Sequence, residues 1–186
     1  MGSGVGETED VPRGLYSLRD RDGAVVDVTT DASGLQIRVE VRAGGWVVRG
    51  GVADGETVWV RTAASGEEAG EDTAPAAGFT GRSPGFLVAV ARLLGLRAGG
   101  TSRVRLVALT EPALAPVPVE VAWSLTTVEE CPAQVGPLPI ERYQTVDLAS
   151  GQPAAVQLAG DVVLAATGVE LDALDTPPTL PSGKSR

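Results

Sequence analysis

Histidine is absent from this chain, and cysteine occurs once, at Cys131. Nucleophilic catalysis by serine or cysteine needs a neighbouring base, so Ser-His-Asp and Cys-His arrangements cannot be built from these residues. Zinc sites take their ligands mainly from cysteine and histidine, which excludes a zinc centre of the usual kind. One cysteine cannot form an internal disulfide. We therefore expect a protein that is not an enzyme and that holds no metal and no cofactor.

Positive charge is also scarce. Lys184 is the single lysine, and 15 basic residues face 24 acidic ones, which gives a net charge of −9. Nucleic-acid phosphates and anionic lipid surfaces both require clustered cations, so neither is an expected partner. No apolar run reaches the roughly 18 residues of a membrane-spanning helix, and the acidic N-terminus lacks the apolar core of a signal peptide. The expected compartment is the cytoplasm.

One segment, residues 83–96, has the pattern of a helix. Ser83 suits the N-cap, Pro84 suits the first helical position, and Gly95 or Gly99 is placed to end the helix. The apolar residues occupy every side of this segment, with Arg92 as its one charge beyond Phe86. A helix of about 14 residues that is apolar all round is too short for a bilayer and must be buried in protein.

The rest of the chain has the patterns of about ten short strands. The clearest is residues 35–42, where Leu35, Ile37, Val39 and Val41 alternate with polar side chains. Turn residues separate the strands, and no alternation of strands with helices occurs, which excludes a doubly wound parallel sheet. The expected fold class is mainly β (α+β). A long curved antiparallel sheet would wrap the single buried helix as a β-roll.

The domain limits follow from composition. Residues 1–12 and 175–186 are expected to be disordered tails around a single β-roll domain at 13–174. Residues 63–77 are acidic and contain no large apolar side chain, so we expect a mobile, solvated surface loop there, with a functional lid as the alternative. Residues 126–139 are expected to be an irregular connection. The acids of the 63–77 segment lack the spacing of a calcium loop.

Aromatic residues make up only 4% of the chain, so we consider each one as a candidate for ligand binding or for an interface. Trp46 and Trp123 are in phase with aliphatic neighbours, which predicts core positions, and Tyr143 belongs to another strand. Trp59 is out of phase with Val58 and Val60, which predicts a tryptophan on the wet face, at a dimer interface or a ligand wall. Five candidates for ligand binding or an interface result: Trp59, Arg92, Trp46, Trp123 and Tyr143. Arg92 either reaches the rim as an ordinary charged residue or meets a polar headgroup or dimer partner.

Several short motifs follow one another along the chain in a distinctive order. They are Gly45-Trp46, Gly78-Phe79-Thr80, the helix end at 91–96, the strand at 105–112, and the closing pair at 161–164 and 168–171. By the order of these motifs, the chain from about residue 14 to residue 174 resembles a bacterial glycolipid-binding family with the spiral β-roll fold. The segment 86–92 and the closing Ala166-Thr167-Gly168 depart from the family pattern. The resemblance implies a homodimer and a lipid or glycolipid ligand.

Three functions remain open on this basis. The leading one is a non-enzymatic protein that binds a lipid, a glycolipid or another amphipathic molecule. A structural or protein-interaction module with a filled core and no small ligand is the main alternative, and an enzyme that uses carboxylates alone is the third. A cavity of a few hundred Å³ beside the helix separates the first from the second.

Overall fold

The computed structural model describes residues 14–19, 23–66, 68–81, 83–133, 136–167, 169–170 and 178. The expectation of disordered tails concerns residues 1–12 and 175–186, which lie outside the described residues apart from Pro178. Strands dominate the described part, and one helix, α1 (Pro84–Leu94), accompanies them. The mainly β fold class is therefore confirmed.

Two sheets replace the single long sheet that the sequence suggests. The first is an antiparallel meander in chain order, with β1 (Gly14–Arg19), β2 (Val25–Thr30), β3 (Gln36–Ala43), β4 (Trp46–Ala53), β5 (Glu56–Ala63) and β6 (Glu68–Ala74). The second runs in the order β13-β12-β11-β10-β9-β8-β7. Its strands are β7 (Phe79–Thr80), β8 (Thr101–Thr110), β9 (Ala115–Cys131), β10 (Leu138–Asp147), β11 (Pro153–Ala159), β12 (Val162–Ala166) and β13 (Val169–Glu170).

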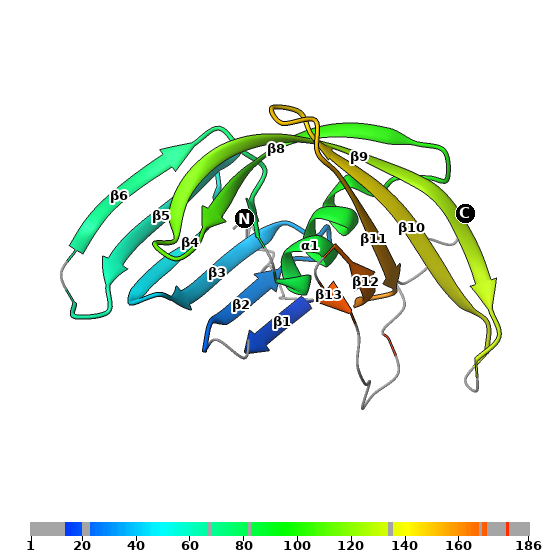
Figure 1. Ribbon diagram of the computed structural model, residues 1–186, viewed down its shortest axis with the longest axis horizontal. Helices are drawn as coiled ribbons and strands as arrows, with labels where there is room; N and C mark the ends of the chain where they lie inside the picture. Colours follow the sequence, from blue (N-terminus) through cyan, green and yellow to red (C-terminus); the bar gives the residue numbers. More distant parts are fainter. Residues whose placement is uncertain are drawn as a thin grey trace, which may run out of the picture.

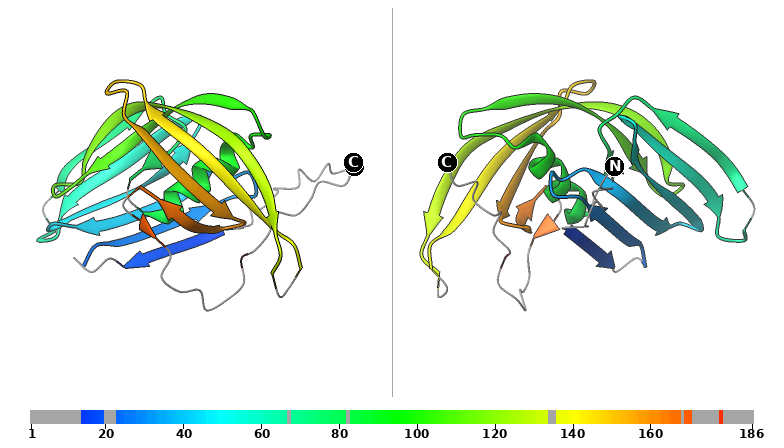
Figure 2. Two further views of the ribbon diagram at one scale, coloured as in Figure 1. Left: turned by 45° about the vertical axis from the view of Figure 1, so that its right-hand side comes forward. Right: turned by 180° about the vertical axis from the view of Figure 1, so that it is seen from behind.

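Helix α1 begins and ends close to the predicted residues. The Ser83 hydroxyl accepts a hydrogen bond from the Gly85 amide at 3.3 Å, and Gly95 takes the left-handed conformation that ends the helix. The helix contacts β1 and β2 of the first sheet and β7 and β12 of the second, and Figures 1 and 2 show it between the two sheets. The sheets enclose it from two sides, which accounts for its apolar sequence.

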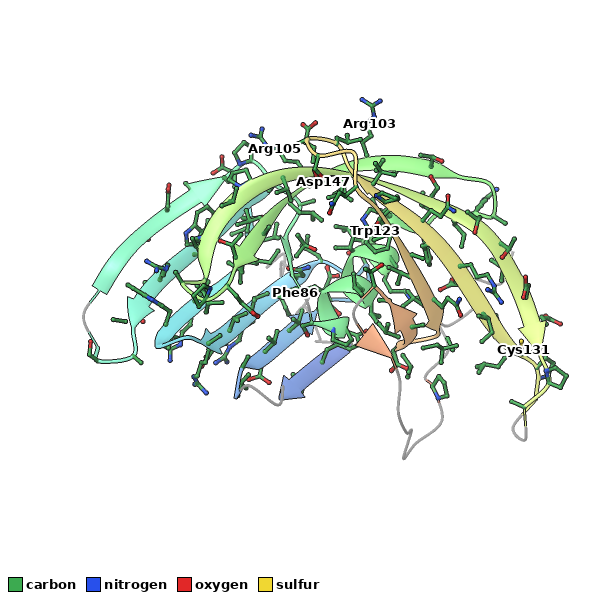
Figure 3. The ribbon with its side chains drawn as sticks, viewed as in Figure 1. Phe86, Arg103, Arg105, Trp123, Cys131 and Asp147 are labelled. Atoms are coloured by element: carbon green, nitrogen blue, oxygen red, sulfur yellow. The ribbon has the colours of Figure 1, made fainter. Side chains whose placement is uncertain are left out.

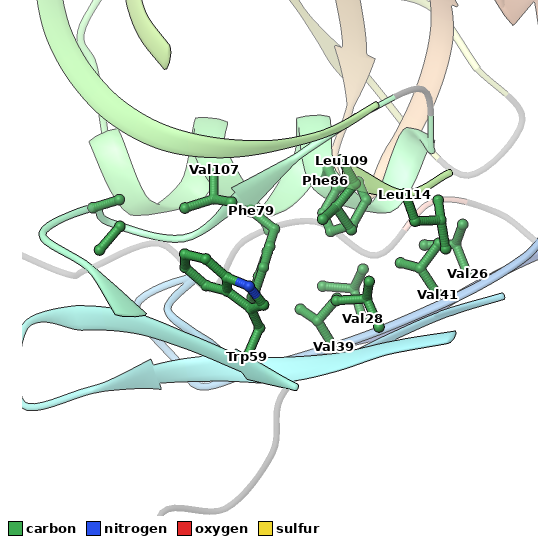
Figure 4. Packing of buried hydrophobic residues seen from close by; sticks show 14 residues of the cluster. Val26, Val28, Val39, Val41, Trp59, Phe79, Phe86, Val107, Leu109 and Leu114 are labelled. Atoms are coloured by element: carbon green, nitrogen blue, oxygen red, sulfur yellow. The ribbon is translucent and has the colours of Figure 1, made fainter. Parts of the chain in front are cut away.

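The buried residues form two clusters, one on each side of the helix. Phe86 and Ala89 pack into the first cluster, with the valines of β2 and β3 (Figure 4). Val88, Val90 and Ala91 pack into the second cluster, among side chains of β8 to β12. Residues from several sides of one helix thus contribute to the two clusters, which explains why no polar face remains.

Strand β6 is a correction to the expected mobile loop at 63–77. Residues 68–74 pair with β5 through an antiparallel ladder, and their side chains at Glu71, Asp72 and Thr73 are exposed. An edge strand needs no apolar face because backbone hydrogen bonds hold it, and acidic side chains protect it from pairing with other chains. The alternation of apolar and polar residues that usually indicates a strand is therefore missing from residues 68–74, although they form β6.

The segment 126–139 is also more regular than expected. Strand β9 continues to Cys131 and pairs with β10, so that the two strands form an arm, with Cys131 near its end (Figure 3). Pro116 and Pro118 lie where β9 pairs with β8 alone, so the strand begins at a sheet edge, where a missing backbone N–H is tolerated.

Candidate functional site

A pocket of about 420 Å³ lies beside the first turns of helix α1. It is bounded by the helix, by the end of β8 and the turn that follows it, and by strands β10, β11 and β12 of the second sheet. The lining residues are Gly81, Leu87, Leu109, Thr110, Glu111, Thr145, Ala154, Ala155, Val156, Ala166 and Thr167.

Burial sorts these lining residues by depth. Leu109, Thr145 and Val156 are buried and form the floor of the pocket. Leu87 of the helix and Ala166 are half-buried and form walls, together with Gly81 and Ala154. The remaining lining residues are exposed and form the mouth: Thr110, Glu111, Ala155 and Thr167. The exposed lining residues are thus polar apart from Ala155, and the buried ones are apolar except for Thr145.

Small side chains account for the open space. Ala154 on β11 and Ala166 on β12 stand at positions of the second sheet that larger residues fill elsewhere, as Val156 and Leu158 do on β11. The side chains of Ala154 and Ala166 are single methyl groups, and they leave space between the sheet and Leu87. An isoleucine or leucine at either position would fill that space. The geometry suits an apolar or amphipathic molecule of modest size, because ligand pockets commonly measure about 300–1,000 Å³.

None of the five predicted site residues lines this pocket. Trp59 does not face solvent, so its predicted orientation is wrong: it is 8% exposed and packs edge-to-face on Phe79, with ring centroids 6.3 Å apart. Its neighbour Val58 is the exposed residue. Figure 4 shows the indole and the Phe79 ring directed toward each other. A ligand or interface role for Trp59 stays a prediction without support from its position.

Strand β5 turns its polar face inward because that face finds acceptors there. The Thr57 hydroxyl donates to the Ala76 carbonyl at 2.9 Å. The Arg61 guanidinium donates to the Ala113 carbonyl from Nε at 2.9 Å and from Nη2 at 2.7 Å. Arg61 also lies 3.4 Å above the Trp46 ring, which places Trp46 at the edge of the first cluster. Hydrogen bonds that are distant in sequence thus decide the phase of the strand.

Trp123 and Tyr143 are core residues of the second sheet, 2% exposed each. Their rings pack edge-to-face at 5.6 Å between centroids. The core position predicted for Trp123 is confirmed. Both residues are neighbours of the lining residue Thr145 and do not line the pocket themselves. Trp123 pairs with Thr145 across the sheet, and Tyr143 precedes Thr145 by two positions on the same strand.

Arg92 neither reaches solvent freely nor faces an open site. Its Nη1 donates to Glu141 Oε1 at 3.0 Å, and its Nη2 lies 2.7 Å from Oε2 as an ion-pair contact, although Oε2 accepts no hydrogen bond from the described residues. Nη2 also donates to the Gly160 carbonyl. The side chains of Arg92 and Glu141 are 22% and 17% exposed. The ion pair fixes the helix to β10, which is a third role beside the two that the sequence left open.

The tyrosines and Arg92 influence one another's ionisation. Burial, and next the Glu141 carboxylate, raise the pKa of Tyr143 to about 12, although Arg92 acts in the opposite direction. Burial, followed by the charge of Asp161, raises the pKa of Tyr16. Burial by itself would lower the pKa of Arg92, but its hydrogen bond and charge interaction with Glu141 outweigh burial and raise it. Arg92 is therefore charged at neutral pH, and both phenols are protonated.

Other charged residues form no site in the described part of the chain. Arg103 and Arg105 stand on the outer surface of the second sheet, away from the helix (Figure 3). No group of three or more histidine, cysteine, aspartate or glutamate side chains is placed to hold a metal among the residues described. The helix found there is also too short to cross a membrane.

Sequence reasoning did not identify the residues that line the pocket, because their shared feature is small side-chain volume. Ala154 and Ala166 are each part of an ordinary-looking short strand, and only the packing of β11 and β12 against the helix turns the missing volume into a cavity. The one local indication is the run of small residues at 165–168, which by itself does not distinguish a pocket from a tight contact.

Comparison with known proteins gives a fold likeness and no family. No family model matches the chain, and no curated protein matches it. A crystal structure of a DUF1089 family protein from Pseudomonas aeruginosa aligns with a TM-score of 0.46 and 14% sequence identity. That alignment covers 89% of this chain and 95% of the Pseudomonas protein. A likeness at this level carries no conclusion about function.

Proposed function

We propose that this chain is a non-enzymatic binding protein for an amphipathic molecule of the lipid class. The observation that carries the proposal is the pocket of about 420 Å³ beside helix α1, with Leu109 and Val156 on its floor and Leu87 in its wall. Apolar side chains at that depth favour a hydrocarbon group, and the polar mouth favours a head that stays near water.

The role of the helix follows from this proposal. With Phe86 and Val90 fully packed in the two clusters, α1 is the plug of a β-roll, and the pocket is the space that the plug leaves unfilled. The family resemblance of the sequence points independently to a lipid or glycolipid. A filled interaction module without a ligand is the rival, and it predicts that the pocket stays empty in every assay.

The test fills the pocket. We expect octanol to bind the unaltered protein, with NMR chemical-shift changes as the measurement of binding. Octanol should bind Ala166→Leu at least about tenfold more weakly, since the added side chain takes up the cavity. Ala165→Leu is the matched control, because adjacent residues of a strand point to opposite faces and Ala165 does not line the pocket. Equal binding by both variants, or none by the unaltered protein, would reject the proposal.

Native mass spectrometry gives a second, independent measurement. Protein purified from its own host should carry a co-purified lipid of low mass, and Ala166→Leu should carry less of it than Ala165→Leu. Repeated recovery of the bare chain from the host would favour the filled module instead.

We also propose a homodimer, on the strength of the family resemblance. Val117 and Val128 of β9 are 43% and 45% exposed, which leaves apolar surface for a second copy. Light scattering should give twice the chain mass of 19.0 kDa at micromolar concentration, and the monomer mass would contradict the dimer.

A further inference from the structure

Thr145 is a polar residue on the floor of the pocket. It is 9% exposed, and it lies on β10 between Trp123 of β9 and Ala154 of β11. Its hydroxyl makes no hydrogen bond with any residue in the described part of the chain. Buried side-chain oxygens without a partner occur at Glu40 and Glu141 among the described residues, and the Thr145 oxygen is not one of them, so it faces the open space of the pocket. Water or a ligand in the pocket is therefore its available partner.

Hydroxyl groups elsewhere around the pocket are already engaged. The Thr110 hydroxyl donates to the Ala115 carbonyl at 2.9 Å, and the Thr167 hydroxyl accepts from the Ala155 amide at 3.4 Å. Both residues belong to the mouth, where water is also available. Thr145 differs in lying deep and in having its donor and acceptor unused.

A valine would fill the same volume at this position with no polar group to satisfy. Valine and threonine share a branched shape that suits a strand, so packing alone does not require the hydroxyl. A hydroxyl that faces the pocket bonds to water when the pocket is empty, and a ligand that displaces this water without replacing the hydrogen bond loses affinity. The position of Thr145 therefore indicates a polar atom in the ligand that reaches the floor.

The charge of the ligand follows from the other lining residues. None of the described residues that line the pocket is basic. Among these described lining residues, a carboxylate or phosphate placed at Thr145 would find no cation to offset the loss of its hydration, whereas an uncharged hydroxyl or carbonyl needs only the one hydrogen bond.

We infer that Thr145 selects an uncharged amphiphile, with an alcohol or carbonyl oxygen that hydrogen-bonds to its side chain at the floor of the pocket. This inference rests on the proposed function, since it concerns the same pocket. It makes Thr145 a specificity-determining residue and excludes free fatty acids as the preferred ligands.

Three probes of equal chain length test the inference: octanol, octane and octanoate. The unaltered protein should bind octanol more tightly than both others. In Thr145→Val, octanol should bind about fivefold more weakly, which is what a neutral hydrogen bond is commonly worth, and octane should bind at least as well as before. Thr126→Val is the control, because its hydroxyl donates to the Arg142 carbonyl and the residue does not line the pocket, and it should leave the order of the probes unchanged.

The outcomes separate this inference from the proposed function. If the probes bind and Ala166→Leu blocks them, but octanol and octane bind equally and Thr145→Val changes nothing, the pocket is a binding site and the inference is wrong. That result would mean that water satisfies Thr145. Tighter binding of octanoate than of octanol would also overturn it. If Thr145→Val fails to fold, the order of the three probes on the unaltered protein still decides.

Discussion

Arg92 and Glu141 illustrate how a single charged residue is accommodated beside a buried helix. Their ion pair joins α1 to β10 across 49 residues of sequence, and the Gly160 carbonyl accepts a further hydrogen bond from the guanidinium. Both side chains are mostly withdrawn from water, so each depends on the other to offset its lost hydration.

We expect Arg92→Met to lower the free energy of unfolding by about 3 kcal/mol, because it leaves the Glu141 carboxylate withdrawn from water without its partner. The double variant Arg92→Met/Glu141→Leu should recover most of that loss, since an apolar pair of similar volume avoids the desolvation of both charges. Urea unfolding of the two single variants and the double variant measures the coupling. Additive losses would show that the pair contributes no specific interaction.

The raised pKa of Tyr143, about 12, predicts a loss of stability in alkali. Between pH 10 and pH 12 the unfolded chain releases the phenol proton while the folded chain retains it, so the free energy of unfolding falls as the pH rises. Below pH 10 both states hold the proton and the contribution is fully present. Urea unfolding at several alkaline pH values checks this, with tyrosinate absorbance as a direct readout.

In Tyr143→Phe the free energy of unfolding should fall less steeply between pH 10 and pH 12 than in the unaltered protein, because phenylalanine has no proton to release. Tyr16, whose pKa is also raised, accounts for a separate part of the titration, and Tyr16→Phe measures that part. An identical pH dependence in Tyr143→Phe would show that its phenol titrates at the same pH in both states.

At the scale of elements, helix α1 is positioned by a turn as well as by its own caps. The turn between β2 and β3 is held by Asp31 Oδ1, which accepts from the amides of Ser33 and Leu35 at 2.8 and 2.9 Å. Gly34 in this turn has φ +90°, and a Cβ there would lie 2.6 Å from the Leu93 amide nitrogen. The turn therefore packs directly on the backbone of the last helical turn.

We expect Gly34→Ala to be more destabilising than Gly55→Ala by about 1–3 kcal/mol, the usual cost of forcing extra volume into a packed contact. Gly55 has φ +81° and nothing within 4 Å of the Cβ position, so it reports the conformational cost alone. Thermal or urea unfolding of both variants gives the difference. Equal losses would show that the helix moves aside without cost.

At the scale of the whole molecule, Gln36 joins the two sheets. Its Nε2 donates to the Phe79 carbonyl at 2.9 Å, and its Oε1 accepts from the Phe79 amide at 2.7 Å. The buried side chain of β3 thus takes the place of a neighbouring strand for β7, which otherwise pairs only with β8. Arg61 and Ala113 make a second polar link between β5 and the turn after β8.

Replacing Gln36 by leucine should lower the free energy of unfolding by about 3 kcal/mol, because two buried backbone groups of Phe79 lose their partners. Gln144→Leu, at an exposed position of β10, is the control and should change stability by less than about 0.5 kcal/mol. Chemical denaturation checks both. A small loss in Gln36→Leu would mean that β7 finds other partners.

Local sequence patterns predicted the helix and the strands well where residue type and hydrophobic periodicity indicate the same structure. Residues 35–42 alternate strictly, and β3 spans Gln36–Ala43. Strand β6 was missed because an edge strand can be polar on both faces. Trp59 was placed on the wrong face because β5 carries apolar side chains on both, so alternation alone does not choose the phase.

The sequence by itself determined the helix with its caps, most of the strands, and the absence of histidine-based catalysis, because each depends on residue types or neighbours along the chain. Tertiary structure decided the division into two sheets, the partner of Arg92, the inward face of β5 and the pocket. These features depend on groups far apart in sequence: Glu141 reaching Arg92, Ala113 and Ala76 accepting from β5, and small side chains of β11 and β12 meeting Leu87. The pattern of neighbouring residues does not predict such contacts. Several conformations are equally compatible with the local sequence, and packing and long-range hydrogen bonds choose among them.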